Sequence, residues 1–331
     1  METIYAKPLT GIKLAQVRIF LADLGLDWDN RVQATFLIYE DGVLVATGSR
    51  QKNVLKCIGV ANNSQGEGYA ATLVSLLSRE GLEAGYRHLF LYTKPENIPF
   101  FLGLGFYEVA VAQGAALLEN RRCGVRGFIE SVRKPAIEYP VGCVVANCNP
   151  FTNGHLYLME QAATSCGSLY IFILSEENSR FDAATRLRLV QEGLSHLQNA
   201  TISATGGYLV STASFPDYFI RDKSLVRNIS CALDIEIFTR HFVKQLGISR
   251  RFVGTEPYSA VTGAYNEQMK AVLPFSGVEV VELSRLEYDG AAVSASRVRA
   301  LLDEGRLSEA RPLVPESTWR FLEKGGFDGS V

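Results

Sequence analysis

The sequence has few histidines, no paired cysteines and no long apolar segment, and each absence excludes a class of protein. Only four histidines occur among the 331 residues, and the six cysteines are scattered without a C-x-x-C pair. This pattern disfavours a zinc site or a disulfide framework and is typical of reduced, partly buried thiols. No apolar run approaches the roughly 18–20 residues that a membrane helix requires. We therefore expect no membrane partner and no metal site formed by the protein alone.

The sequence also lacks an excess of either charge. It has 33 lysine and arginine residues against 35 aspartate and glutamate residues, a formal net charge of −2. Non-specific nucleic-acid binding requires a clustered basic surface, so we expect no nucleic-acid partner. The N-terminal residues carry charges without an intervening apolar stretch, which predicts no signal peptide and a cytoplasmic location. Hydrophobic residues make up 47% of the chain, a globular composition long enough for two domains.

The first part of the chain, residues 1–135, has the pattern of a mixed α/β domain. Periodicity and turn residues predict, in order, a helix near 14–24, strands near 34–39, 43–47 and 54–60, a helix near 69–83, and strands near 89–92 and 106–111. A glycine-rich bend precedes the second of these helices. We expect this bend to be the chemically active feature of the domain.

The second part, residues 136–331, alternates strands and helices regularly. Strands are predicted near 142–146, 169–174, 200–203, 251–253 and 278–283, and helices near 155–166, 183–197, 223–246, 263–273 and 296–304. Such alternation predicts a Rossmann-like domain, in which helices cover a parallel sheet. Ligands of such domains gather at the carboxyl ends of the strands.

The segment 144–155 runs from an apolar strand through a polar loop into a helix. Its candidate ligand-binding residues are Asn149, Phe151, Thr152, Gly154 and His155. Free backbone N–H groups and the positive end of the helix dipole make a helix start an anion site. Gly154 would let a phosphate approach the backbone, while Thr152 and His155 would donate hydrogen bonds to it. The alternative is a simple strand-to-helix turn with a surface histidine.

A second segment of this kind lies near the other end of the chain, directly before a short amphipathic helix. It contributes Ser294, Ser296, Arg297 and Arg299. A serine there is consistent with an ordinary N-cap. Two hydroxyls and two guanidinium groups at a helix start also suit a phosphate, which arginine binds through paired donors. The two candidate phosphate-binding segments lie about 140 residues apart in the alternating α/β pattern.

This pair of segments resembles the nucleotidyltransferase superfamily, whose T/H-x-G-H loop and I-S-x-S/T-x-x-R segment bind ATP from opposite sides. Val293 stands where the superfamily usually has isoleucine. The segments 215–222 and 251–258, together with Thr262 and Asn266, are similar to one branch of it, the citrate lyase ligase family. The similarity extends over essentially the whole chain. Residues 136–331 would then form a nucleotidyltransferase, or cytidylyltransferase-like, domain.

The resemblance implies an ATP-dependent activation of acetate, with Mg²⁺ carried by the ATP. Acetyl-adenylate would form with release of pyrophosphate, and a thiol on the acyl-carrier (gamma) subunit of citrate lyase would accept the acetyl group. By their matching motif positions, His155, Thr152 and Arg299 are the expected catalytic residues, with His155 as a hydrogen-bond donor. The same comparison places Ser294 and Arg297, with their neighbours, on the β- and γ-phosphates.

Three further ATP-binding residues follow from the same resemblance. Arg186 matches an arginine position of the relatives, although an exposed helix charge is the alternative. Gly254 ends a strand where the adenine or ribose would lie. Glu256 would bind the ribose or a metal, or would merely cap the next turn.

The bend before the helix at 69–83 fits the motif Q-x-x-G-x-A and resembles the GNAT acyltransferase family. Glycines there let successive N–H groups face a pyrophosphate. The resemblance implies that this domain binds the pantetheine arm of the acyl-carrier subunit through Gln65, Gly66, Gly68, Ala70, Asn97 and Tyr107. Tyr107 is a proton donor by analogy, with a buried structural tyrosine as the alternative. The domain would otherwise serve only folding or docking.

Three other functions remain open on these residues. One is a simple nucleotidyltransferase that makes a dinucleotide-type product. Another is an acetyl-coenzyme A-dependent acetyltransferase that uses the first domain. The third is a nucleotide sensor without catalysis, which two intact phosphate-binding segments make the least favoured.

Overall fold

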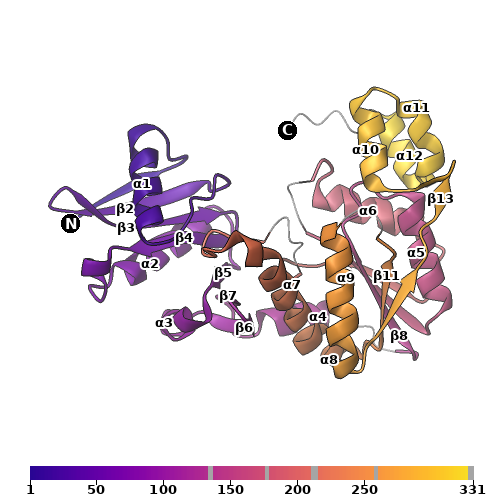
Figure 1. The fold of residues 1–331 in the computed structure, drawn as a ribbon, viewed down its shortest axis with the longest axis horizontal. Helices are drawn as coiled ribbons and strands as arrows, with labels where there is room; N and C mark the ends of the chain where they lie inside the picture. The colour runs from indigo at the N-terminus through magenta and orange to yellow at the C-terminus, as the bar shows by residue number, and fades with distance from the viewer. Residues whose placement is uncertain (133–136, 176–178, 210–214, 257–259, 327–331) are drawn as a thin grey trace. The chain divides into compact units, whose positions relative to one another are not determined.

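A computed structural model describes the chain except for residues 133–136, 176–178, 210–214, 257–259 and 327–331 (Figure 1). The residues group into two compact units. The first unit comprises Met1–Val125 and Phe215–Glu236, and the second comprises Arg126–Ser214 and Ile237–Val331. From the sequence, residues 215–236 were expected in the second domain. The expected boundary between residues 135 and 136 lies outside the described residues.

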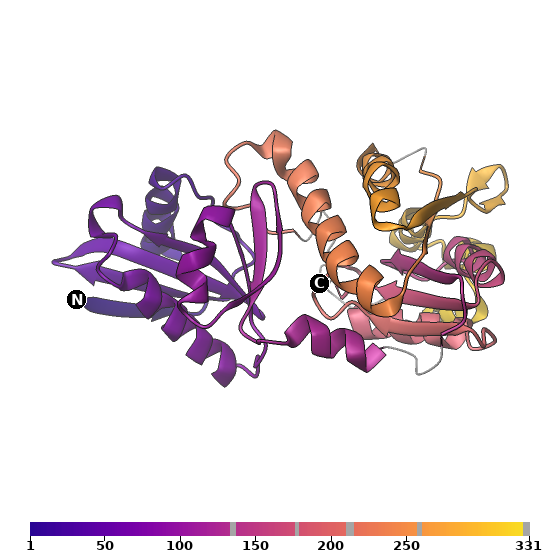
Figure 2. The same cartoon turned by 90° about the horizontal axis from the view of Figure 1, so that it is seen from below.

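The first unit contains a seven-stranded sheet in the order β1-β2-β3-β4-β5-β7-β6. Its strands are β1 (Glu2–Ala6), β2 (Ala34–Glu40), β3 (Val43–Gln51), β4 (Val54–Val60), β5 (Phe90–Thr93), β6 (Tyr107–Ala112) and β7 (Ala115–Glu119). Its helices are α1 (Gly11–Asp23), η1 (Asn62–Ser64), α2 (Tyr69–Glu83), η2 (Pro95–Asn97), α3 (Ile98–Leu102) and η3 (Lys223–Leu225). Helix α2 packs on β2, β3 and β4 (Figure 2). It buries Leu73 and Leu77 against the sheet.

The strands β4 and β5 are parallel neighbours that pair only briefly. Val54 lies opposite Phe90 and Leu55 opposite Leu91. The other neighbouring strands of this sheet are antiparallel. Among the described residues, the rest of β4 therefore has no strand partner on the β5 side, and a gap opens between the two strands.

Residues of the segment 215–236 lie against this part of the first unit. The hydroxyl of Tyr218 donates to the carbonyl oxygen of Tyr92 on β5 at 3.2 Å. The N–H of Asp27 donates to the carbonyl oxygen of Tyr218 at 2.8 Å. The Phe215 ring meets the Tyr92 ring edge-on, with 5.7 Å between centroids. These contacts join the segment to the first unit.

The second unit contains a five-stranded parallel sheet in the order β10-β9-β8-β11-β12, beside a two-stranded hairpin, β13-β14. The strands are β8 (Val141–Ala146), β9 (Ser168–Ile173), β10 (Ala200–Ala204), β11 (Arg250–Gly254), β12 (Glu279–Leu283), β13 (Glu287–Tyr288) and β14 (Ala291–Ala292). The helices are α5 (Asn153–Thr164), α6 (Ala183–Gly193), η4 (Phe238–Val243), α8 (Lys244–Leu246), α9 (Ala260–Val272), η5 (Leu273–Ser276), α10 (Ala295–Asp303), α11 (Leu307–Ala310), η6 (Arg311–Leu313) and α12 (Glu316–Glu323). The division between the units falls within two further helices, α4 (Gly124–Val132) and α7 (Val226–Ile237).

The predicted fold class, a mixed α/β domain followed by a domain with a parallel sheet, is confirmed. Helix α5 packs on β8 and β9, and buries Met159 and Ala162 in a core shared with Ile171. The strands β8 and β11 pair only at Gly142 with Arg250 and Cys143 with Arg251, and then separate toward their carboxyl ends. No helix in the described part of the chain is both long and apolar enough to cross a membrane.

Candidate active site

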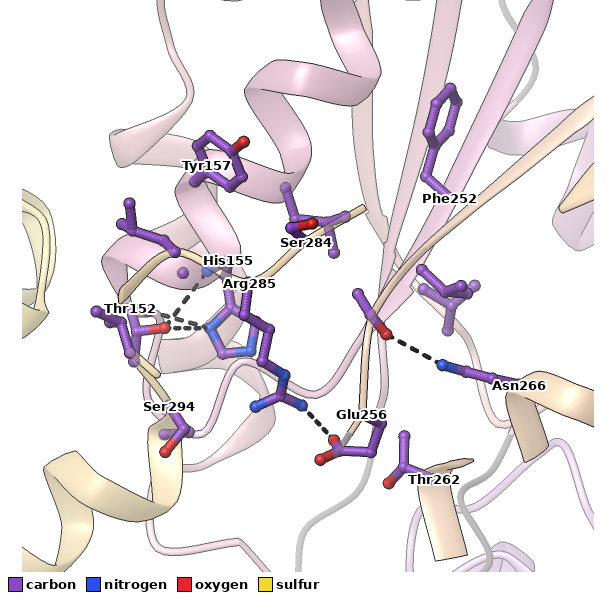
Figure 3. Close-up of a pocket in the computed structure, with 18 of the residues that line it drawn as sticks. Thr152, His155, Tyr157, Phe252, Glu256, Thr262, Asn266, Ser284, Arg285 and Ser294 are labelled. Atoms are coloured by element: carbon purple, nitrogen blue, oxygen red, sulfur yellow. Dashed lines mark hydrogen bonds and ion pairs between the residues drawn. The ribbon is translucent and has the colours of Figure 1, made fainter. Parts of the chain in front are cut away.

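Helix α5 begins at a reciprocal cap between Thr152 and His155. The Thr152 side chain accepts the N–H of His155, and the Thr152 N–H donates to Nδ1 of the imidazole at 3.1 Å (Figure 3). Threonine is a favoured N-cap because its oxygen accepts one of the unpaired N–H groups of the first turn. The cap fixes the orientation of the imidazole ring.

The same cap determines which nitrogen of His155 carries the proton. A backbone N–H can only donate, so Nδ1 must accept, and the proton of the neutral ring lies on Nε2. Burial and the nearby positive charge of Arg285 lower the pKa of His155 to about 4. At neutral pH the ring is therefore uncharged and offers one donor, Nε2–H.

Helix α10 begins at Ser294, whose hydroxyl accepts the N–H of Arg297 at 3.2 Å and lies 3.1 Å from the hydroxyl of Ser296. The N-cap interpretation of Ser294 is therefore correct, and the Ser294 hydroxyl lies at the N-terminal end of α10. The two arginines of this segment donate to different partners. Arg299 donates to the carbonyl oxygen of Asn149, whereas Arg297 donates to the carbonyl oxygen of Tyr288 at 2.9 Å.

The two helix starts touch at Gly154. A Cβ atom on this glycine would lie 2.4 Å from the carbonyl oxygen of Val293, a distance that a real side chain cannot adopt. The absence of a side chain therefore lets the segment before α10 pack directly against the first turn of α5. The sequence analysis expected Gly154 to admit a phosphate; in the structure its Cβ position faces the backbone of the other segment.

Around this contact lies a cavity of about 610 Å³ at the carboxyl ends of β8 and β11 (Figure 3). Its volume is within the range of small-molecule sites, roughly 300–1,000 Å³. The predicted residues on its wall are Thr152, Gly154, His155, Gly254, Glu256, Ser294, Ser296 and Arg299. The structure thus brings together residues from two segments about 140 positions apart in the sequence.

Comparison with known proteins identifies the family. Residues 141–322, more than half of the chain, match the family described as "Citrate lyase ligase C-terminal domain". A citrate (pro-3S)-lyase ligase of Escherichia coli (strain K12) is 36% identical over 320 residues, covering 94% of this chain and 90% of the relative. The chain belongs to the citrate lyase ligase family. The predicted family and the predicted enzyme class, a ligase, are confirmed.

Other similar proteins match most of this chain or only part of it. The corresponding ligase of Klebsiella pneumoniae is 38% identical over 287 residues, with 84% of this chain and 83% of the relative covered. A phosphopantetheine adenylyltransferase of Shouchella clausii is 28% identical over 136 residues, with 38% of this chain and 86% of the relative covered. Among solved structures, Escherichia coli ElaA aligns with a TM-score of 0.34 and 14% identity, covering 36% of this chain and 99% of ElaA.

Four predicted ATP-binding residues of the ligase lie off the cavity wall. These are Asn149, Phe151, Arg186 and Arg297. The ring of Phe151 is fully buried in the core beneath α5. The Asn149 side chain accepts the N–H of Phe181 at 3.1 Å and so holds the loop in place.

Arg186 has a structural environment that the sequence did not predict. It is fully buried and donates to the carbonyl oxygens of Asn147 at 2.7 Å, Leu174 at 2.9 Å and Phe181 at 3.0 Å. The alternative of an exposed helix charge is wrong. The guanidinium group joins the loops that follow β8 and β9, because it satisfies carbonyl oxygens that would otherwise be buried without donors.

Sequence reasoning missed Arg285, which follows β12. Its Nε donates to the carbonyl oxygen of Thr255 at 2.6 Å, and its Nη2 pairs with the Glu256 carboxylate (Figure 3). Glu256 is therefore engaged by an arginine. The available signal was a basic residue directly after a predicted parallel strand, at the edge where ligands bind.

Other wall residues also lay outside the site prediction. They are Val145, Tyr157, Leu158, Arg251, Phe252, Val253, Thr262, Tyr265, Asn266, Met269, Ser284, Leu286, Val293 and Ala295. Asn266 is buried and donates to the carbonyl oxygen of Gly254 at 3.0 Å. Within the described residues, no group of three or more histidine, cysteine or acidic side chains is arranged to hold a metal. The arginines, hydroxyls and Nε2–H of this wall suit an anionic ligand that brings its own cation.

The first unit has a separate cavity of about 310 Å³ in the gap between β4 and β5. Of the residues predicted for the pantetheine arm, Gln65 and Asn97 line it, together with Lys94 and Tyr218. Gly66, Gly68, Ala70 and Tyr107 lie off its wall. Gly66 and Gly68 have φ angles of +91° and +84°, which explains why the bend requires glycine. Tyr107 is 39% exposed, so the alternative of a buried structural tyrosine is wrong.

Proposed function

We propose that this ligase uses ATP to activate acetate as acetyl-adenylate and then acetylates the prosthetic-group thiol on the acyl-carrier subunit of citrate lyase. One observation carries the proposal: two helix starts from distant segments meet at a single cavity rich in hydrogen-bond donors. The phosphopantetheine adenylyltransferase relative, which matches 38% of this chain, also supports the use of ATP.

The donors around the contact between α5 and α10 suit a triphosphate. Both helices direct the positive end of their dipoles and unpaired N–H groups toward the cavity. Arg299 adds a full charge, and the hydroxyl of Ser294 can donate to a phosphate oxygen while it caps α10. Mg²⁺ bound to the phosphates would neutralise charge on the leaving pyrophosphate.

In the first step, a carboxylate oxygen of acetate attacks the α-phosphorus, and the bond from that phosphorus to the bridging oxygen of the β-phosphate breaks. The products are acetyl-adenylate and pyrophosphate. Negative charge increases on the α-phosphate oxygens and on the leaving oxygen. The neutral imidazole of His155 donates Nε2–H to this charge without itself transferring a proton, because acetate is already ionised at neutral pH.

In the second step, the carrier thiol loses its proton and its sulfur attacks the acetyl carbonyl carbon. The bond from this carbon to the phosphate oxygen breaks, so AMP leaves and a thioester forms. The gap between β4 and β5 suits a pantetheine arm, because β4 beyond Leu55 has backbone groups free of strand pairing on that side. Gln65, Lys94 and Asn97 supply polar contacts along the wall.

The first step is tested by acetate-dependent exchange of labelled pyrophosphate into ATP, with no carrier protein present. We expect exchange in the wild type and a loss of about 10²-fold or more in His155→Gln, the order of magnitude for a transition-state donor. His196→Gln is the matched control, because His196 is an exposed histidine that pairs with Glu160. Exchange that requires no acetate, or that survives His155→Gln, would contradict the proposal.

The relatives favour one alternative, an adenylyltransferase that acts on a phosphopantetheine compound. The same assay separates the two functions, because that enzyme would exchange pyrophosphate only in the presence of such a substrate. Acetyl transfer from acetyl-coenzyme A without ATP would instead indicate an acetyltransferase.

The role of the first unit is tested at its glycine-rich bend. Gly68→Val should slow acetylation of the carrier thiol and leave acetate-dependent exchange within about twofold of the wild type. Gly85→Val is the matched control: Gly85 has a φ of +91° and open space around its Cβ position, yet lies at the far end of α2. Equal loss of both steps in Gly68→Val would count against a pantetheine site.

A further inference from the structure

One arginine of the second unit lines the active-site cavity where β8 and β11 begin to separate. The strands β8 and β11 separate after the pair Cys143–Arg251, and the cavity occupies the opening beyond it. Arg251 lines this cavity although it is only 4% exposed. It therefore combines deep burial with access to the ligand space.

The guanidinium group of Arg251 lacks a counter-charge among the described residues. Its Nη1 lies 3.5 Å from Cys143 Sγ, and its central carbon lies 4.7 Å from the centroid of the Phe238 ring. Its Nε has no hydrogen-bond partner within the part of the chain that the structure describes. Burial raises the pKa of the Cys143 thiol to about 11, so this sulfur is neutral and does not balance the charge.

A buried arginine without a counter-charge lowers the stability of the fold. A buried charge is normally paired, and contact with an aromatic ring offsets only part of the cost of removing it from water. In the same unit, Arg186 is also fully buried but donates to several carbonyl oxygens. Arg251, by contrast, lines the cavity and keeps a buried Nε without a partner among the described residues.

The cavity that Arg251 lines has an apolar part. Val145, Phe252, Val253 and Met269 belong to it. An anion that fits there has a small charged head and an apolar remainder. A short-chain carboxylate has this form, whereas a triphosphate would leave most of its oxygens facing apolar side chains.

We propose that Arg251 binds the carboxylate of the acid substrate. This inference rests on the proposed function, in which acetate is that acid, and it adds the residue that selects it. A carboxylate that accepts hydrogen bonds from a guanidinium group keeps a lone pair on each oxygen. One oxygen therefore remains able to attack the α-phosphorus of an ATP molecule held at the helix starts.

The test compares Arg251→Met with Arg251→Lys in the pyrophosphate-exchange assay, with acetate and ATP varied separately. We expect Arg251→Met to raise the KM for acetate by 10- to 100-fold, equivalent to about 1.4–2.7 kcal/mol, and to leave the KM for ATP within threefold. Arg251→Lys keeps the charge and should give an intermediate KM for acetate. Phe238→Leu is the control, because it removes the ring beneath the guanidinium and preserves the charge.

A second measurement separates binding from a structural role. Sodium acetate should raise the thermal unfolding midpoint of the wild type and not that of Arg251→Met. The midpoint of Arg251→Met without acetate should equal or exceed that of the wild type, because an unpaired buried charge has been removed.

An unchanged KM for acetate in Arg251→Met, or an equal rise in the KM for ATP, would overturn the assignment and leave the proposed function intact. A lowered midpoint with unchanged kinetics would show a structural arginine. If the wild type shows no acetate-dependent exchange, the proposed function fails and this inference fails with it.

Discussion

The contact between Gly154 and Val293 gives the sharpest prediction, because the distance from an added Cβ atom to the Val293 carbonyl oxygen is known. In Gly154→Ala, the new Cβ would lie 2.4 Å from the Val293 carbonyl oxygen. Ordinary contacts of this kind are about 3.4 Å or longer, so the segment before α10 must move about 1 Å away from α5. The obstacle is backbone, which cannot rotate aside as a side chain can.

Such a displacement separates the donors of α5 from those of α10. A misplacement of about 1 Å in a catalytic site can cost about 10²-fold in rate, so we expect kcat/KM for ATP in acetate-dependent exchange to fall by that order. The effect on folding should be smaller. Overpacking costs roughly 1–3 kcal/mol, and replacing glycine by alanine in a helix restores roughly 0.5–1 kcal/mol of it.

The matched control is Gly127→Ala. Gly127 is also a helical glycine, but its Cβ position has no atom within 4 Å. This substitution should leave exchange unchanged and should not reduce the free energy of unfolding in urea. If Gly154→Ala retains the wild-type kcat/KM while Gly127→Ala behaves as expected, the close approach of the two segments has no role in ATP binding.

Three further predictions concern the cap that orients His155. The pKa of His155 is about 4 in the folded state and 6.5 in a free side chain. The neutral ring therefore contributes its full stabilisation above pH 6.5, and this contribution is lost as the pH falls toward 4. The difference is worth about 3 kcal/mol at about 1.4 kcal/mol per pH unit, so urea unfolding between pH 7.5 and 4.5 should show a weaker pH dependence in His155→Gln than in the wild type. Arg285→Gln removes a positive charge near the ring and should raise the pKa of His155, as NMR titration of the imidazole would measure; no rise would contradict that electrostatic contribution. Thr152→Ala removes the N-cap and should lower the free energy of unfolding by about 1 kcal/mol, whereas Thr164→Ala, at the other end of α5, should have a smaller effect; equal losses would argue against the cap.

Local sequence patterns were sufficient for most elements that build the site. The strand Val54–Val60 and the helix Tyr69–Glu83 have the predicted bounds, and the five parallel strands lie within one or two residues of their expected positions. Alternation and helical periodicity depend on neighbours in the sequence, so one chain suffices to detect them. The N-cap at Ser294 was visible for the same reason, whereas Thr152 was expected to contact a phosphate and not to cap α5.

Features that depend on contacts between distant residues were not visible. Arg285 lies outside any motif, and Arg251 begins a segment that indicated only the family; the folded sheet places both on the cavity wall. Arg186 matched a motif position, yet its carbonyl partners come from loops that approach it only in three dimensions. The sequence therefore identified the two helix starts but not the charges that surround them.

The membership of residues 215–236 in the first unit has a consequence for biosynthesis. A ribosome completes residues 1–125 long before it reaches Tyr218, which lies 93 residues after Val125. At about 5–20 residues per second, this delay is about 5–19 s. During that interval the carbonyl oxygen of Tyr92 lacks the hydroxyl that later donates to it. The first unit is therefore the first to begin folding, but it reaches its final form only after much of the second unit has been synthesised.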